Sequence, residues 1–136
     1  MNKKFRFLAF AALGVVILAW SNSPAQEREI NWKLVSKNLV RALASENEGL
    51  QQSAMEIFVR HADRLDINAA VYDVMRVYRN HPSPRVRKLA LVTLYKMQNK
   101  WAMEFLKLDL RFQDDETLKR MVAAILLEYQ AKKKAS

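Results

Sequence analysis

The stretch from Asn80 to Gln98, NHPSPRVRKLALVTLYKMQ, decides the fold that the sequence predicts. Pro82 disfavours the α conformation at the residue before it, so a preceding helix should end near Asn80. Ser83 as N-cap and Pro84 as the first helical residue then start another helix. The apolar stripe of that helix is Val86, Leu89, Ala90, Leu94 and Met97. The stretch therefore predicts a tight turn between two amphipathic helices.

Apolar residues at helical spacing also occur on both sides of this stretch. In total the sequence predicts six helices, and the helix that starts at Pro84 is the fourth of them. Asp66 or Asn68 is the candidate N-cap of the helix that ends near Asn80, and Asp114 to Glu116 should cap the last helix. The predicted stripes are Ile30, Leu34, Leu39, Val40 and Leu43; Leu50, Ala54, Ile57 and Phe58; Val71, Val74, Met75 and Tyr78; Trp101, Phe105, Leu106 and Leu110; and Leu118, Met121, Val122, Ile125 and Leu126.

Composition supports a single all-α domain. The chain has 136 residues, of which 51% are hydrophobic, and only 2 are glycine and 3 are proline. A β-rich fold of this size normally needs more turn glycines. We expect a leader over residues 1–25, a polar lead-in over 26–29, a helical domain over 30–131 and a basic tail over 132–136.

The second, fourth and sixth predicted helices align with one another. Leu50, Val86 and Leu118 correspond, at offsets of 36 and 32 residues, and so do Ala54, Ala90 and Val122. Two helices in thirty-odd residues are typical of an α-solenoid. This spacing predicts a short array of about three antiparallel helix pairs.

The unit from Ser83 to Met97 resembles the second helix of a HEAT repeat. That family's pattern has an acid, a proline, a variable residue, Val and Arg, followed by a small residue and Leu. Pro84, Val86, Arg87, Ala90 and Leu94 fit this pattern, whereas a serine replaces the usual acid. The flanking repeats match only in their apolar positions. The resemblance implies a scaffold or a peptide- or protein-binding surface, and implies no particular partner.

The N-terminus has the layout of a secretory signal peptide. Lys3, Lys4 and Arg6 precede a 13-residue apolar run, Leu8 to Trp20, which is short for a membrane span. Small residues then suit cleavage between Ala25 and Gln26. An exported and most simply a periplasmic address is expected, with secretion, or retention by an uncleaved N-terminal anchor, as the alternatives. Cleavage would reduce the net charge from +9 to +6.

No pattern of residues points to catalysis or to a cofactor. The chain has no cysteine and no glycine-rich phosphate loop, and its two histidines, His61 and His81, are expected at the surface. Aromatic residues lie at helical spacing and are expected in the core rather than in a stacking platform. They are Trp32, Phe58, Trp101, Phe105 and Phe112.

The clearest charge feature is Val74 to Met103, which contains seven basic residues and no acid. They are Arg76, Arg79, Arg85, Arg87, Lys88, Lys96 and Lys100. One interpretation is a docking patch for an acidic partner or anionic lipid headgroups. The simpler one, which we favour, is a solvated face on which Arg87 bridges to a neighbouring repeat. Nucleic acid is not an expected partner of an exported protein.

Another candidate surface comprises residues beside the core stripes of the second, fourth and sixth helices. They are Gln52, Glu56 and Val59; Lys88, Val92 and Tyr95; and Arg120, Ala124 and Leu127. This mixture suits a protein or peptide better than a small molecule. Leu127 ends a run of seven apolar residues that a single buried face cannot accommodate, so we expect it to be uncovered. It is the candidate contact for a homodimer or for the partner.

The sequence thus predicts an exported, non-enzymatic interaction or scaffold module. The alternative is a structural protein of the cell envelope, held at the membrane by its N-terminal helix and its basic residues.

Overall fold

The computed structural model describes residues 28–136, and this part of the chain is helical, without strands. Its α-helices are α1 (Trp32–Ala44), α2 (Glu48–Arg60), α3 (Val71–Asn80), α4 (Pro84–Met97), α5 (Lys100–Asp109) and α6 (Glu116–Ala135), and a 3-10 turn, η1 (Asn68–Ala70), precedes α3. The all-α prediction is therefore confirmed for these residues. The predicted leader and its cleavage site lie outside them. Within the described residues, no helix combines the length and the apolar character that a membrane span requires.

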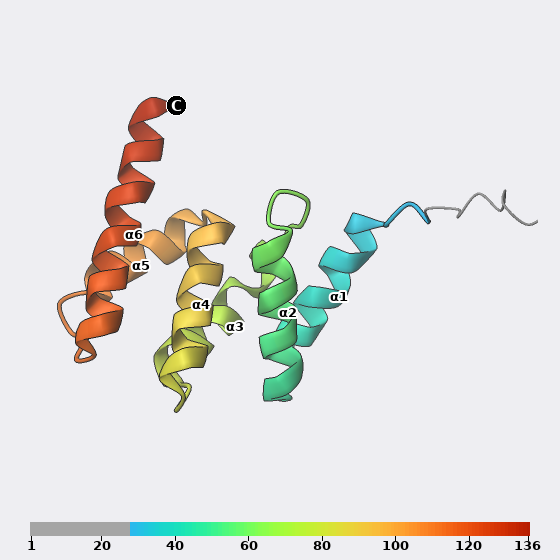
Figure 1. Cartoon of the computed structure of the whole chain (residues 1–136), viewed down its shortest axis with the longest axis horizontal. Coiled ribbons are helices and arrows are strands. Elements are labelled where there is room, and N and C mark those ends of the chain that lie inside the picture. The colour runs from blue at the N-terminus through green and yellow to red at the C-terminus, as the bar shows by residue number, and fades with distance from the viewer. Residues whose placement is uncertain (1–27) are drawn as a thin grey trace, which may run out of the picture. The chain divides into compact units, whose positions relative to one another are not determined.

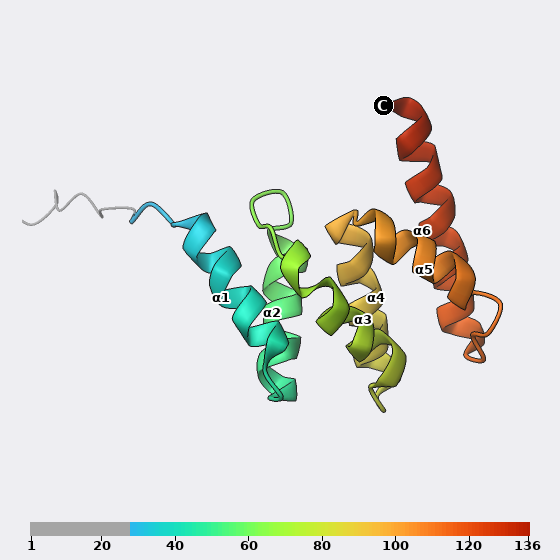
Figure 2. The same cartoon turned by 180° about the vertical axis from the view of Figure 1, so that it is seen from behind.

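The unit formed by residues 31–136 is built from consecutive helix pairs. Helix α1 packs on α2, α3 on α4 and α5 on α6, and further contacts join α2 to α4, α4 to α6 and α1 to α3. These contacts produce two layers. Figure 1 shows α2, α4 and α6 in front of α1, α3 and α5, and Figure 2 shows the same layers from behind. Helix α4 contacts neighbours in both layers and therefore lies at the centre of the packing.

Side-chain caps define the starts of four helices. The carboxamide oxygens of Asn31, Asn47 and Asn99 accept hydrogen bonds from backbone N–H groups of α1, α2 and α5, at 3.0, 2.9 and 3.0 Å. Asp115 caps α6 through the N–H groups of Thr117 and Leu118. These bonds satisfy donors that the first turn of a helix leaves free. The predicted start of α6 among three acidic residues is confirmed.

The predicted caps of α3 and α4 differ from what the structure shows. Pro84 does begin α4 and Ser83 precedes it, but the serine side chain makes no capping hydrogen bond. Asp66 instead accepts hydrogen bonds from the backbone and side chain of Asn68, and α3 begins three residues later without a side-chain cap. Proline at the first helical position removes one free N–H donor, which lessens the need for a cap at α4.

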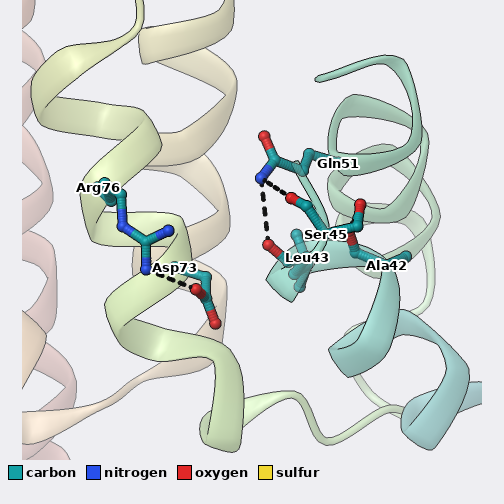
Figure 3. Close-up of polar contacts among 6 residues, drawn as sticks. All are labelled: Ala42, Leu43, Ser45, Gln51, Asp73 and Arg76. Carbon is teal, nitrogen blue, oxygen red and sulfur yellow. Dashed lines mark hydrogen bonds and ion pairs between the residues drawn. The ribbon is translucent and has the colours of Figure 1, made fainter. Parts of the chain in front are cut away.

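The loop between α1 and α2 is closed by one side chain. Gln51 donates hydrogen bonds from Nε2 to the carbonyl oxygens of Leu43 at 3.2 Å and Ser45 at 2.6 Å (Figure 3). Ser45 Oγ also donates to the Ala42 carbonyl at 2.7 Å. The last carbonyls of a helix have no partner within it, so these bonds terminate α1 and tie it to α2.

The core runs through all six helices and contains apolar residues that the stripes did not predict, such as Met55, Leu91 and Met103. It includes Leu39, Leu43, Ala54, Met55, Phe58, Val74, Met75, Tyr78, Val86, Ala90, Leu91, Leu94, Ala102, Met103, Leu106, Leu118 and Val122. The polar residue Thr93 of α4 is also buried, and its hydroxyl donates to the Leu89 carbonyl at 2.8 Å. All four predicted stripe residues of α3 are buried.

Five residues predicted in the stripes are exposed instead. They are Ile30, Leu34, Leu50, Ile57 and Trp101, with exposed fractions from 40 to 54%. In α2 the buried side is formed by Ala54, Met55 and Phe58, so the stripe keeps two predicted residues and is rotated toward Met55. In α5 a similar rotation buries Ala102 and Met103. Apolar periodicity alone does not distinguish the centre of a stripe from its edge.

The expectation that both histidines lie at the surface is correct for His61 but wrong for His81. His61 is exposed and packs against Trp32, with ring centroids 5.3 Å apart. The side chain of His81 is only 10% exposed. Its Nδ1 accepts a hydrogen bond from the Ser83 N–H at 3.0 Å, and this bond holds the turn between α3 and α4. In the neutral ring the proton is therefore on Nε2, which lies 3.5 Å from the Glu48 carboxylate.

Ala90 provides a test of the packing. Its side chain is fully buried in α4, within the hydrophobic core cluster. We expect Ala90→Leu to lower the free energy of unfolding by about 1–3 kcal/mol through overpacking. Chemical denaturation followed by circular dichroism measures this change. Ala124→Leu, at an exposed position of α6, is the control and should be nearly neutral. Equal stabilities of the two variants would contradict this packing.

Candidate interaction surfaces

The candidate surface on α2, α4 and α6 is accessible in the structure. Of its residues, Gln52, Glu56, Val59, Lys88, Val92 and Tyr95 are partly exposed, whereas Arg120, Ala124 and Leu127 are exposed. The aligned positions Ala54, Ala90 and Val122 are all buried beside it. The prediction that Leu127 is uncovered is confirmed, since 69% of it is exposed. Hereafter we call these nine residues the even-helix face.

Two residues of the even-helix face contact basic residues just outside it. Lys132 Nζ donates a hydrogen bond to the Tyr95 hydroxyl at 2.7 Å, and this bond raises the pKa of Lys132 above its ordinary value. Glu56 lies 3.9 Å from Arg60 in the next turn of α2. Lys132 belongs to α6, which continues to Ala135, so the predicted basic tail is helical over most of its length. The tail therefore borders the face through its first lysine.

The basic residues of Val74 to Met103 do not share one environment. Arg76 forms an ion pair of 2.7 Å with Asp73, which lies just outside that segment (Figure 3). Arg87 is directed inside the fold, as described below, and Lys88 lies close enough to Asp115 to help lower the pKa of that carboxyl. Arg79, Arg85, Lys96 and Lys100 are exposed, and they take part in none of the ion pairs among residues 28–136.

A polar network joins α3, α4 and the segment between α5 and α6. The buried Tyr78 donates its hydroxyl hydrogen to Asp109 at 2.8 Å and accepts one from Gln113 Nε2, also at 2.8 Å. Arg87 donates from Nε to the Tyr78 carbonyl at 2.9 Å and from Nη2 to Gln113 at 3.4 Å. Gln113 also accepts from the Asp115 N–H at 3.2 Å. The expectation that Arg87 bridges to the next helix pair is thus confirmed.

The network has clear electrostatic consequences. Burial of the Tyr78 ring, together with its hydrogen bond to the Asp109 carboxylate, raises the pKa of Tyr78 well above its ordinary value. The backbone hydrogen bond from Leu118, and then that from Thr117, lowers the pKa of Asp115, with Arg87 and Lys88 adding to the effect. An open pocket of about 270 Å³ lies over the network. Because the polar groups of the network mostly pair with one another, the main role of the network is to join helices.

Sequence inspection missed a second pocket, between α3 and α5. It has a volume of about 250 Å³ and is lined by Tyr72, Met75, Arg76, Arg79, Asn80, Trp101 and Phe105. The rings of Tyr72 and Trp101 lie 4.5 Å apart, and those of Trp101 and Phe105 lie 5.7 Å apart. Tyr72 is 63% exposed and Trp101 is 40% exposed. We call these seven lining residues the aromatic pocket.

The aromatic residues had been expected in the core, and that expectation is correct only in part. Phe58 is buried and Trp32 and Phe105 are partly buried, but Phe112 is 78% exposed. Trp101 is exposed because it directly precedes the buried pair Ala102 and Met103 in α5. In the sequence, the signal for this exposure was an aromatic residue directly before a small and a flexible residue that both suit the core. No group of three or more metal-ligating side chains occurs in the described part of the chain.

The Tyr78 network predicts a pH dependence of stability. Because the pKa of Tyr78 is higher in the folded chain than its ordinary 10.0, folding retains its proton. This contribution is complete below about pH 10 and is lost as the pH rises further. Tyr78→Phe should remove that alkaline component and lower the free energy of unfolding at neutral pH by about 1–3 kcal/mol. Denaturant titrations across this pH range measure both effects. Tyr72→Phe is the control, and parallel pH profiles for the wild type and Tyr78→Phe would contradict the assignment.

Leu127 generates a prediction about assembly. Together with Arg120, Ala124 and Ala131 it forms an exposed stripe on α6, with an apolar centre. We expect Leu127→Glu to lower the oligomeric mass at high protein concentration, or to abolish partner capture, because it introduces a charge into an apolar contact. Leu108→Glu is the control, since Leu108 is 62% exposed on α5. A monomeric wild-type chain whose partner capture is the same in both variants would exclude this contact.

Comparison of the chain with protein-family models, curated proteins and solved structures gives no match. The resemblance of Ser83 to Met97 to a HEAT repeat therefore depends on those residues alone. The packing of α4 against neighbours in both layers is an independent observation on the same stretch.

Proposed function

We propose that this chain is an exported, non-enzymatic protein-interaction module, built as a short HEAT-type array of three helix pairs. The observation that carries the proposal is the accessible even-helix face on a layer of three helices. Aligned positions of α2, α4 and α6 are buried at Ala54, Ala90 and Val122, and the neighbouring positions remain available for contact. Repeat arrays commonly bind partners on such continuous surfaces.

The proposed array is supported by the contacts at the joints between pairs. Arg87, the position that the HEAT pattern assigns to arginine, spans from α4 to the Tyr78 carbonyl of α3 and to Gln113 before α6. Asn99 at the start of α5 also donates to Asn68 of η1 at 3.2 Å. Such bonds couple neighbouring units, as nearest-neighbour stability in a repeat protein requires.

The chemical character of the even-helix face favours a protein or peptide as partner. It combines a carboxamide, an acid, bases, an aromatic ring and aliphatic side chains. Protein interfaces have this mixture of an apolar centre and a polar rim. Tyr95 and Val92 lie on α4, the central helix, and are the proposed anchors.

The alternative function is a structural role at the cell envelope, with an uncleaved N-terminal helix and exposed basic residues holding the chain at the membrane. The observation that favours it is the exposure of Arg79, Arg85, Lys96 and Lys100 without acidic partners in the described part. Fractionation followed by N-terminal sequencing separates the two functions. A soluble chain that begins at Gln26 favours the interaction module, and an intact N-terminus in the membrane pellet favours the structural role.

The proposed interaction is tested by affinity capture from the native envelope, with the full gene product expressed from its own leader and tagged at the C-terminus. Val92→Glu and Tyr95→Ala should each reduce the captured partner about tenfold or more, as expected for anchors of an interface. Leu108→Glu, on the other layer, should capture as much as the wild type. Thermal unfolding establishes that the variants remain folded. Absence of any partner under mild conditions, or equal capture by all three variants, would contradict the proposal.

A further inference from the structure

The aromatic pocket has an arrangement that core packing alone does not require. Tyr72 and Trp101 pack against each other, yet they leave 63% and 40% of their surfaces in solvent. Large apolar side chains that gather at a hollow on the surface often mark a site of recognition. The hollow lies on α3 and α5, in the layer opposite to the even-helix face. It is therefore a site separate from that face.

The two arginines of the pocket are in different states. Asp73 holds Arg76 in an ion pair of 2.7 Å, which fixes its position and neutralises its charge. The Arg79 guanidinium lies 5.4 Å from the centre of the Phe105 ring, and no carboxylate of the described residues forms an ion pair with it. Stacking on an aromatic face holds an arginine while leaving its N–H groups directed to other partners. Arg79 thus presents one positive charge beside an aromatic wall.

The pocket's size matches a single side chain better than a free ligand. Its volume of about 250 Å³ is below the ~300–1,000 Å³ of typical small-molecule sites. Aromatic walls favour an aromatic or large aliphatic occupant, because stacked or tilted rings attract beyond their buried area. A guanidinium at the rim favours a carboxylate, with which it can form two parallel hydrogen bonds.

We propose that the aromatic pocket binds a short acidic segment of a partner protein. A large apolar side chain of the segment enters between Tyr72, Trp101 and Phe105, and the carboxylate of a neighbouring Asp or Glu pairs with Arg79. This inference rests on the proposed function only in requiring a protein partner, and it assigns a different surface to the contact.

Other anionic partners fit the pocket less well. A membrane surface would have to reach a hollow rather than a protrusion. Single-stranded nucleic acid also stacks on aromatic rings, but it requires a row of cations along its backbone. Arg79 is the one cation of the pocket lining without an acidic partner among the described residues. One unpaired cation is enough for a single carboxylate.

Binding can be measured by fluorescence anisotropy with a labelled peptide that alternates Phe and Glu between Gly and Ser, acetylated and amidated at its ends. We expect Arg79→Glu and Tyr72→Ala each to weaken binding at least tenfold, and Arg85→Glu to change it less than twofold. Arg85 is a matched control because it is an exposed arginine outside the pocket. Replacing Glu by Gln in the peptide, or Phe by Ala, should weaken binding to a similar extent.

Several outcomes would overturn the proposal. These are equal binding by Arg79→Glu and Arg85→Glu, equal binding of the Gln-substituted peptide, or stronger binding of phosphatidylglycerol vesicles or oligothymidylate through the same residues. Circular dichroism and thermal unfolding of each variant separate loss of binding from loss of fold. Val92→Glu should leave peptide binding unchanged. If the peptide binds but no envelope partner is captured, the pocket is supported and the proposed function is contradicted. If a partner is captured but the peptide does not bind, only the proposal for the pocket is contradicted.

Discussion

The hydrogen bonds of Arg87 are the constraint on which the middle of this structure depends. One guanidinium joins the end of α3, its own helix α4 and the segment that leads into α6. The Tyr78 carbonyl would otherwise be one of the free acceptors at the end of α3, where a buried and unpaired group is costly. The Tyr78 hydroxyl then pairs with Asp109 and Gln113. Helices that meet only through apolar contacts can slide, whereas this network sets their register.

The same network has a consequence for the two surfaces. Arg87 and Asp109 both form hydrogen bonds within the network, so these two charges stabilise the fold and are not available for a partner. Arg79 precedes the network in α3, is exposed and stacks on Phe105. A run of basic residues in the sequence is thus divided by the fold into a structural residue, a residue paired with Asp73 and residues left for binding. We propose the even-helix face and the aromatic pocket as two contact sites on opposite layers.

The all-α class was predictable because the local signals agree with one another. Proline at the start of α4, the acids before α6 and the apolar spacing of α3 each specify their element through short-range physics, and all three are present in the structure. The exposure of Leu127 was also predictable, since seven consecutive apolar residues cannot share one buried side. The candidate residues on α2, α4 and α6 followed from the alignment of these three helices, and their accessibility agrees with that alignment.

By itself, the sequence determined that these segments are helical, where α4 and α6 begin and which residues compete for the core. Only the tertiary structure decided which edge of each apolar stripe turns inward. Leu50 and Ile57 give way to Met55 in α2, and Trp101 gives way to Ala102 and Met103 in α5. The physical reason is that a helix rotates by about 100° per residue, so a stripe tolerates this shift until a neighbouring helix packs against it. The aromatic pocket exists because α3 and α5, separated in sequence by α4, bring Tyr72 and Trp101 together. No local pattern contains that information.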